Sequence, residues 1–281
     1  MEAGKRSRTA EGAAAVRALH QVLDEPRILD DPIAARVIGQ QEFDRQKKIA
    51  RLFPFLKRLR AHFAMRSRYA EDCLAESFDR GVRQYVLLGA GLDTFAYRQP
   101  PWANQLRVFE VDHPATQEWK REKLAAAQVS IPANLTFAGV DFEKVSLREG
   151  LASAGLDFSV PTFFSCLGVT QYLTAASFEG SLKLVASMPP ASEIVFSFVA
   201  AASHLSGGER FFSGLFAVIA AASREPWLSR FDPRELAAKL TAMGFSKVIH
   251  FSGEAANDRY FRGRRDGLAL TKVEQMMRAI V

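Results

Sequence analysis

The chain has 281 residues and a formal charge of +6 at pH 7, with 48% hydrophobic and 24% charged residues. At roughly 150 residues per domain, this length allows one large domain or two small ones. The composition excludes disordered, collagen-like and miniprotein classes. Only two cysteines occur, Cys73 and Cys166, which excludes a disulfide framework and fits a reducing compartment. The positive charge leaves open an anionic partner: nucleic acid, a membrane surface or an acidic substrate.

No targeting or membrane segment is expected. The first nine residues are polar, and Glu11 and Gly12 interrupt any apolar stretch that could serve as a secretory signal. The longest nearly apolar run, residues 211–222, is shorter than the roughly 20 residues that span a bilayer. We therefore expect a soluble, cytoplasmic protein with no membrane partner.

The first 83 residues are predicted to form a helical N-terminal cover. Thr9 can cap a first helix, and Asp30-Asp31-Pro32 predicts the start of a second. Apolar residues over 43–79 recur with the helical period of 3.6. Pro54 lies inside that pattern, so we expect a kink or break there.

From residue 84 onward, short apolar runs alternate with helical segments. Six runs predict buried strands, at residues 84–88, 106–111, 135–140, 162–167, 193–199 and 247–251. Helices are predicted between most of them, at about 114–128, 146–154, 174–187 and 233–243. This alternation indicates an α/β fold whose parallel sheet is covered on both faces. We expect one domain, with a cofactor-binding half at 84–198 and the C-terminal half of the sheet at 233–281.

A long insertion interrupts this pattern after the fifth strand. Residues 199–232 precede the helix that starts near Pro233, which is too long for a plain connection. The insertion holds His204, Phe211 and Trp227 and would lie at the carboxyl edge of the sheet, where open α/β sheets bind ligands. We predict that it forms a lid; packing against the N-terminal helices is an alternative compatible with a lid.

A glycine turn follows the first predicted strand. The segment Val86 to Arg98, VLLGAGLDTFAYR, runs from a buried strand into Gly89-Ala90-Gly91. Glycines are needed where the chain turns sharply and a ligand approaches the backbone. Thr94 stands where the third glycine of a G-x-G-x-x-G fingerprint would be, and no P-loop occurs. The turn therefore predicts a nucleotide-like ligand without a pyrophosphate cradle.

Acidic residues lie at the ends of the second and third predicted strands. Glu110 and Asp112 end the second predicted strand, and Asp141 follows the third. Glu110 and Asp112 alternate with Val111, so their side chains would point the same way in an extended chain. An acid at the end of the second strand can accept hydrogen bonds from a ribose diol. Together with the glycine turn, these acids predict a ribose-containing cofactor.

Several motifs resemble those of one protein family. SRTAEG at 7–12, GAGLDTFAYR at 89–98, FEVDHP at 109–114, FFSCLGVTQYLT at 163–174 and YFRGRRDGL at 260–268 are similar to the leucine carboxyl methyltransferase-like family of S-adenosylmethionine-dependent O-methyltransferases, in its bacterial, mycobacterial-type branch. The resemblance covers nearly the whole chain. It implies a class I methyltransferase (Rossmann-like) fold, with a seven-stranded sheet whose last strand, near 276–281, is antiparallel.

The resemblance implies S-adenosyl-L-methionine as the cofactor and roles for residues around it. Gly89 and Gly91 would line its methionine part, and Asp93 of the same motif is predicted to join this site. Arg8 and Arg66 match basic positions that reach the cofactor carboxylate in the family. A guanidinium suits that task because it can bind a carboxylate through two hydrogen bonds.

The resemblance also assigns the nucleoside part of the cofactor. Asp112, with Glu110, would hold the ribose, and Asp141 and Phe142 would flank the adenine. No metal site is expected, because the ligand spacings of common metal motifs do not occur.

The acceptor side of the reaction is less defined. A carboxylate acceptor is already a nucleophile, whereas a hydroxyl acceptor needs a base, typically a histidine. His204 is the candidate base, with a solvated loop histidine as the alternative. Tyr172 and Thr170 follow the fourth strand and could orient an acceptor, although Tyr172 could simply pack. Leu167 stands where family members often carry a glutamate, which leaves the acceptor open.

Two basic clusters allow an alternative function, RNA methylation. They comprise Arg45, Lys47, Lys48, Arg51, Lys57, Arg58 and Arg60, and Arg259, Arg262, Arg264 and Arg265. A solvated helix face and a basic loop would also account for them, and we favour that interpretation over nucleic acid binding. The sequence thus predicts an O-methyltransferase acting on a carboxylate or hydroxyl of a small metabolite. A non-catalytic cofactor-binding module is a further alternative, and the oligomeric state stays open.

Overall fold

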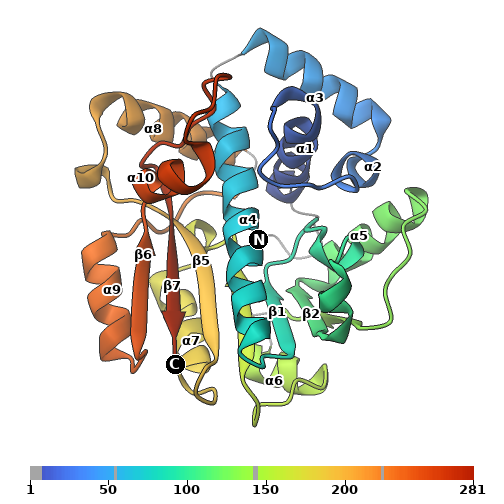
Figure 1. The fold of residues 1–281 in the computed structure, drawn as a ribbon, viewed down its shortest axis with the longest axis vertical. Coiled ribbons are helices and arrows are strands. Elements are labelled where there is room, and N and C mark those ends of the chain that lie inside the picture. The colour runs from blue at the N-terminus through green and yellow to red at the C-terminus, as the bar shows by residue number, and fades with distance from the viewer. Residues whose placement is uncertain (1–7, 54–55, 142–144, 223–224) are drawn as a thin grey trace.

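The computed structural model describes residues 8–53, 56–141, 145–222 and 225–281. It contains one seven-stranded sheet (Figure 1) made of β1 (Gln84–Leu88), β2 (Arg107–Asp112), β3 (Leu135–Gly139), β4 (Thr162–Cys166), β5 (Glu193–Val199), β6 (Lys247–Phe251) and β7 (Glu274–Ile280). The strand order is β3-β2-β1-β4-β5-β7-β6. Strands β1 to β5 pair in parallel, and β7 runs antiparallel to both β5 and β6. The predicted Rossmann-like class I methyltransferase fold is therefore confirmed.

The central strands are apolar because both faces of the sheet are covered. Every residue of β1, β4 and β5 is buried, as expected for strands inside a two-sided parallel sheet. Side chains alternate between the faces: Tyr85 and Leu87 join one core cluster, whereas Val86 and Leu88 join the other. The six predicted runs and the expected last strand match the observed strands within two residues at each end.

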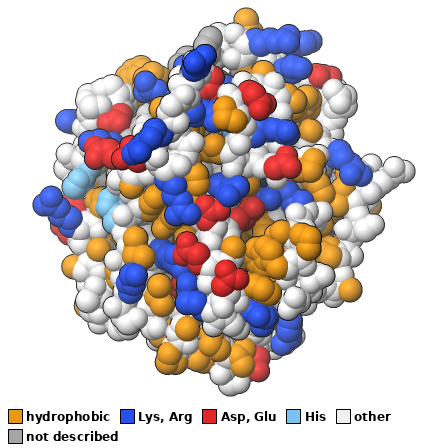
Figure 2. All heavy atoms as spheres, viewed as in Figure 1, with side chains coloured by type: hydrophobic (Ala, Val, Ile, Leu, Met, Phe, Trp, Pro, Cys, Tyr) orange, Lys and Arg blue, Asp and Glu red, His pale blue; other side chains and the backbone are white. Residues whose placement is uncertain are grey.

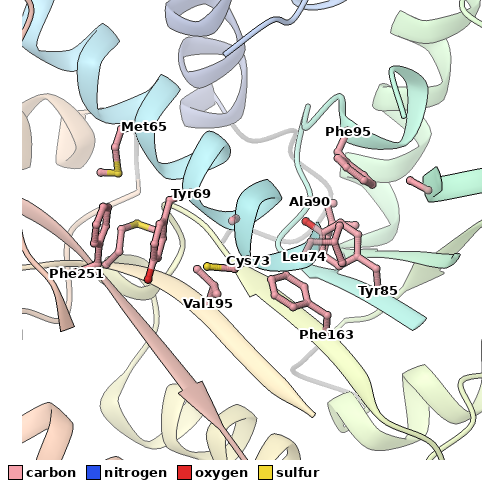
Figure 3. Packing of buried hydrophobic residues seen from close by; sticks show 14 of the residues in the cluster. Met65, Tyr69, Cys73, Leu74, Tyr85, Ala90, Phe95, Phe163, Val195 and Phe251 are labelled. Carbon is pink, nitrogen blue, oxygen red and sulfur yellow. The ribbon is translucent and has the colours of Figure 1, made fainter. Parts of the chain in front are cut away.

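Helices cover both faces of the sheet. They are α1 (Arg8–Leu23), α2 (Ala34–Ile38), α3 (Gln40–Leu52), α4 (Lys57–Asp79), α5 (Pro114–Ala126), α6 (Leu147–Ser153), α7 (Ala175–Ala186), α8 (Gly207–Ala222), α9 (Pro233–Ala242) and α10 (Gly253–Ala256). Helix α4 crosses the front of the sheet in Figure 1, and its Met65, Tyr69 and Cys73 pack on that face (Figure 3). The Tyr69 ring stacks on Phe251 with 4.0 Å between centroids. Helices α6, α7 and α9 bury their apolar residues against the opposite face.

The N-terminal helices pack on one another and on α5. Ala14 and Ala18 of α1 and Val37 of α2 form a cluster with Trp119 and Leu124 of α5. Small residues on α1 allow this close packing, because alanine side chains leave room for neighbouring helices. The helical cover predicted for the first 83 residues is therefore attached to the sheet through α5 as well as through α4.

One of the two predicted helix starts is wrong. Thr9 lies inside α1, which begins at Arg8, so it is not the residue before the helix. The start predicted at Asp30-Asp31-Pro32 lies just before α2, which begins at Ala34, and the Asp31 carboxylate accepts the Ala34 N–H at 3.1 Å as a helix-capping acid does. Pro54 lies outside the described residues, and the helices on either side of it end at Leu52 and begin at Lys57.

The insertion after β5 contains helix α8. It ends at a parallel bridge between Ala200 and Phe231, which returns the chain to the sheet. The Glu209 carboxylate accepts the Lys272 N–H at 2.8 Å, so the start of α8 is fixed beside the start of β7. At the other end of the insertion, Thr9 of α1 donates to the Glu225 carboxylate. Within the described ranges, no helix is both long and apolar enough to cross a bilayer.

Candidate active site

A cavity of about 1710 Å³ lies at the carboxyl edge of the parallel strands. The turn after β1, the end of β2, the loop after β4 and the start of β7 form its floor, and residues of α1, α4 and the insertion complete its wall. Sites for a single small ligand measure roughly 300–1,000 Å³. This cavity therefore has room for a cofactor and a second ligand at the same time.

The glycine turn needs both of its glycines for steric reasons. Gly89 has φ +69°, and a Cβ there would lie 2.5 Å from Cγ2 of Val169, in the loop after β4. Gly91 has φ +45°, and its Cβ would lie 3.1 Å from the Cβ of Ala10 in α1. Left-handed backbone suits glycine because other residues meet steric strain there. The turn is thus a close junction of β1, the β4 loop and α1, and all of these segments line the cavity.

Asp112 occupies the place predicted for a ribose-binding acid. It is the last residue of β2 and lines the cavity beside the glycine turn. One carboxylate oxygen accepts the Gly91 N–H at 2.7 Å, and the other accepts the His113 N–H at 2.7 Å. Burial raises the pKa of Asp112, and these two hydrogen bonds oppose that rise. Each oxygen keeps further acceptor capacity for a hydroxyl, so the residue fits a ribose diol.

Glu110 is not brought to the cavity, contrary to the expectation that it would assist Asp112. Its side chain is fully buried, 2.6 Å from Nζ of Lys120, and it accepts a hydrogen bond from the Tyr97 hydroxyl at 3.2 Å. Burial raises the pKa of Glu110 to about 7, although Lys120 lowers it. Glu110 and Asp112 lie on the same face of β2, as predicted. At Glu110, however, that face is covered by Lys120 of α5.

Asp93 and Asp141 both line the cavity, as predicted for cofactor residues. Asp93 accepts the Phe95 N–H at 2.8 Å. Burial raises the pKa of Asp93, but Arg17 and other nearby cations lower it below its ordinary value. The Asp141 carboxylate lies 4.0 Å from Nε2 of His113.

Two predicted cofactor residues lie wholly or partly outside the described residues. Phe142 lies outside the described residues. Arg8 is the first residue of α1, and its side chain also lies outside what the structure describes. Their assigned roles at the adenine and the cofactor carboxylate stay predictions.

Arg66 lines the cavity and pairs with a carboxylate that the sequence did not reveal. It is 7% exposed, and its Nη1 donates to Oε1 of Glu274 at 2.9 Å. The guanidinium lies 4.0 Å from the Phe63 ring centroid and against Gly168, where a Cβ would lie 2.5 Å from Nη1. Burial raises the pKa of Glu274, but Arg66 lowers it below its ordinary value. Glu274 thus supplies an acid beside the β4 loop, in which Leu167 stands where the resemblance implies a glutamate.

Of the three predicted catalytic residues, only Tyr172 lines the cavity. Thr170 is fully buried and donates its hydroxyl hydrogen to the Ser197 carbonyl at 2.7 Å, so it supports the β4 loop. His204 is not a cavity residue, because its Nε2 contacts the Asp232 carboxylate at the start of α9. The structure therefore argues against His204 and Thr170 as groups that touch an acceptor.

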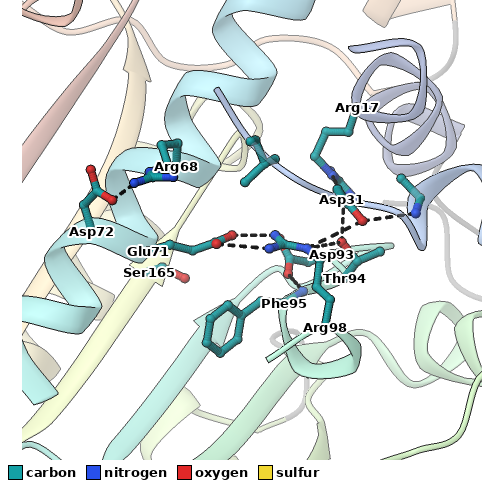
Figure 4. A network of polar contacts seen from close by, with 12 residues as sticks. Arg17, Asp31, Arg68, Glu71, Asp72, Asp93, Thr94, Phe95, Arg98 and Ser165 are labelled. Atoms are coloured by element: carbon teal, nitrogen blue, oxygen red, sulfur yellow. Dashed lines mark hydrogen bonds and ion pairs between the residues drawn. The ribbon is translucent and has the colours of Figure 1, made fainter. Parts of the chain in front are cut away.

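The rest of the glycine motif braces the site. Figure 4 shows Arg98 bound through both terminal nitrogens to Glu71 of α4, at 3.0 and 2.5 Å. The Asp31 carboxylate accepts from the Thr94 hydroxyl at 2.6 Å and from Nε of Arg17 at 3.3 Å. These contacts join α1 and α4 to the segment after the glycine turn. Thr94 and Arg98 therefore hold the wall of the cavity in place.

Comparison with known proteins agrees with this geometry. A family model described as leucine carboxyl methyltransferase matches residues 10–186. The chain is 33% identical to "Putative S-adenosyl-L-methionine-dependent methyltransferase YktD" of Bacillus subtilis, over 100% of this chain and 99% of that protein. It is also 33% identical to an equally described protein of Mycolicibacterium paratuberculosis, over 71% of this chain and 58% of that protein.

Solved structures share the fold at low sequence identity. A putative methyltransferase from Thermobifida fusca has a TM-score of 0.59 and 15% identity, covering 99% of this chain and 96% of that one. A DUF574 family protein from Streptomyces avermitilis has a TM-score of 0.57 and 15% identity, covering 95% and 96%. Together with the family match and the full-length similarity to YktD, the site identifies the chain as a member of the leucine carboxyl methyltransferase family and an S-adenosyl-L-methionine-dependent methyltransferase.

Proposed function

We propose that this methyltransferase acts on the carboxylate of a small acid with an apolar body. The main support for the proposal comes from the hydrogen bonds of the two histidines, His62 and His113, that line the described part of the cavity wall. Nδ1 of His113 accepts the Ala115 N–H at 3.2 Å, and Nε2 of His62 accepts the Thr271 N–H at 3.2 Å. A neutral imidazole with one accepting nitrogen carries its proton on the other, so neither ring offers a free basic nitrogen. A carboxylate acceptor needs no base, whereas a hydroxyl acceptor does.

The rest of the protein's contribution to catalysis would be to hold the cofactor and the acceptor in the correct relative position. The bound cofactor would supply a methyl group on a positively charged sulfur, ready for in-line displacement. Asp112 would hold the ribose, and Arg66 would bind the cofactor carboxylate next to Glu274. Holding two reactants in the correct geometry replaces a bimolecular encounter and accounts for a large share of catalysis in such reactions.

The apolar body of the acceptor is inferred from the cavity wall. Aromatic residues of α4 and of the insertion line it: Phe63, Phe212, Phe216 and Trp227. Such surfaces favour apolar ligand groups and exclude water. A small acid could place its apolar body against these rings while its carboxylate reaches the methyl donor.

Acid partners pair with part of the two basic clusters, which weakens the case for RNA as the substrate. In the first cluster, Arg45 pairs with Glu42 at 2.6 Å, and Arg60, which is buried, pairs with Asp24 at 2.9 Å. Three of the four arginines of the second cluster are also paired: Arg259 with Asp72, Arg262 with Asp258, and Arg264 with Asp266. Figure 2 shows Asp and Glu interspersed among Lys and Arg on the viewed face. A phosphate-binding surface needs cations that are available to the nucleic acid backbone.

A paired acceptor screen tests the proposal. The purified protein receives methyl-labelled S-adenosylmethionine and a panel in which each carboxylic acid is matched by the alcohol of the same skeleton. We expect labelled methyl esters, which alkali hydrolyses, from acids only. Alkali-stable methyl ethers would instead show a hydroxyl acceptor. Cofactor binding by calorimetry without any product across the panel would favour the non-catalytic module.

A further inference from the structure

His62 is a buried cavity residue to which the proposed reaction gives no role. It lies on α4 one helical turn before Arg66, so both side chains lie on the same face of the helix. The residue is 4% exposed and belongs to the cavity wall. A histidine in this position is either a base, a donor to a ligand or a packing residue, and its hydrogen bonds separate these roles.

Thr271 fixes the tautomer of the ring. Nε2 of His62 accepts the Thr271 N–H at 3.2 Å and lies 2.9 Å from the Thr271 hydroxyl oxygen. That hydroxyl oxygen in turn accepts the Val273 N–H at 3.4 Å, which leaves its own hydrogen to point at Nε2. Since a backbone N–H can only donate, Nε2 is the unprotonated nitrogen. The proton of the neutral ring is therefore on Nδ1.

The Nδ1–H group has no hydrogen-bond partner among the described residues. Burial lowers the pKa of His62 to about 4, with Arg66 and Arg58 lowering it and Glu274 and Glu209 raising it. The ring is thus neutral at physiological pH and cannot trade its donor for a charged form. Natural proteins pair almost all buried donors, so an unpaired one on a residue that lines the cavity marks a place where a ligand atom could accept.

Trp227 carries the other buried N–H on the cavity wall that lacks a partner among the described residues. It lies on the insertion, three residues after the undescribed positions 223–224. His62 is instead held by helix α4 and by Thr271. Groups on regular elements with fixed hydrogen bonds place a ligand more accurately than groups on loops.

We propose that Nδ1–H of His62 binds the methyl acceptor by donating a hydrogen bond to one of its carboxylate oxygens, leaving the other oxygen to receive the methyl group. This inference rests on the proposed function, because it requires an acceptor with two oxygens. It makes His62 a specificity-determining residue that selects an acid over an amine of the same shape, since an amine would meet the donor with its own hydrogens. A base at this position is excluded by the occupied Nε2.

A matched pair of variants tests the inference. Asn places an amide at the level of Nδ1, whereas Gln places one at the level of Nε2. With S-adenosylhomocysteine bound, binding of decanoate is measured by calorimetry for the wild type, His62→Asn and His62→Gln. We expect His62→Asn to retain decanoate binding and His62→Gln to lose roughly 10- to 100-fold, the range for a hydrogen bond to a charged group. Affinity for S-adenosylhomocysteine should stay the same in all three proteins.

Ring spectroscopy gives a readout that does not depend on acceptor binding. Long-range proton–nitrogen NMR of labelled histidine should show Nδ1 protonated and Nε2 bare at pH 7 and at pH 5.5. A protonated Nε2, or equal decanoate binding by the two variants, would overturn the role of His62 alone. A wild-type protein that binds the cofactor product but not decanoate would count against an apolar acid as acceptor, and thus against the proposed function itself.

Discussion

Replacing Gly89 by alanine tests the steric account of the glycine turn. The new Cβ would lie 2.5 Å from Cγ2 of Val169 and 3.2 Å from its Cγ1, on a backbone with φ +69°. Gly81, just after α4, is a matched control, because it has φ +99° but no atom within 4 Å of a built Cβ. Gly81→Ala therefore probes the backbone strain alone, and Gly89→Ala probes strain together with the collision.

The difference between the two variants can be estimated from the structure. Left-handed backbone costs a non-glycine residue roughly 1–2 kcal/mol. Forcing extra atoms into a packed site costs about 1–3 kcal/mol more. We expect Gly81→Ala to lower the free energy of unfolding by about 1–2 kcal/mol and Gly89→Ala by about 2–5 kcal/mol. Val169→Ala in the Gly89→Ala background removes the colliding methyl groups and should recover about 1–3 kcal/mol.

Urea unfolding followed by circular dichroism measures the wild type, the three single variants (Val169→Ala included) and the double variant, and the midpoints are compared at constant slope. S-adenosylhomocysteine affinity is measured alongside, because the turn also lines the cavity. Equal losses at Gly81 and Gly89, or a Val169→Ala effect that simply adds to that of Gly89→Ala, would refute the steric reasoning.

Three further predictions follow from the site. Asp112→Asn should weaken S-adenosylhomocysteine binding roughly 10- to 100-fold in calorimetry, as expected for a charged hydrogen bond, whereas exposed Asp258→Asn should not; equal affinities would contradict the ribose assignment. His204→Gln should keep the methyl-transfer rate within about twofold, as for substitutions away from a site, and a large loss would restore it as a base. Stability should fall from pH 6.5 towards 4, because the unfolded chain protonates His62 near 6.5 and the folded protein only near 4. The loss at the acid end is about 3 kcal/mol, and urea unfolding of His62→Asn should lack that part of the slope.

Most of the sheet could be predicted because its signal is local. A buried parallel strand is a nearly continuous apolar run, and β1 and β5 contain such runs, with polar residues only at Gln84, Glu193 and Ser197. The start of β7 was less clear, since Glu274 and Gln275 are polar and resemble a loop. The structure pairs them with Val199 and Phe198, where the cavity accommodates Glu274 and a part-buried hydrogen bond with His250 accommodates Gln275.

Site residues could be predicted from the sequence only where they belong to a local motif. Asp112 follows a strand and lies next to the glycine turn, so its position could be read from the chain. The pairing of Arg66 with Glu274 spans 208 residues and depends on β7 entering the sheet beside β5. The tautomer of His62 likewise depends on Thr271, which is distant along the chain. Spacing cannot reveal such contacts, and it could not show that Lys120 covers Glu110.

The position of β7 has a consequence for how the protein is made. It is the last strand along the chain, yet it lies between β5 and β6 and brings Glu274 to Arg66. During synthesis the ribosome releases β5 and β6 before their shared neighbour exists, so both expose unpaired edges for that time. The cofactor site can close only after this strand is added. A nascent chain of this protein therefore keeps those edges unpaired until β7 has been synthesised.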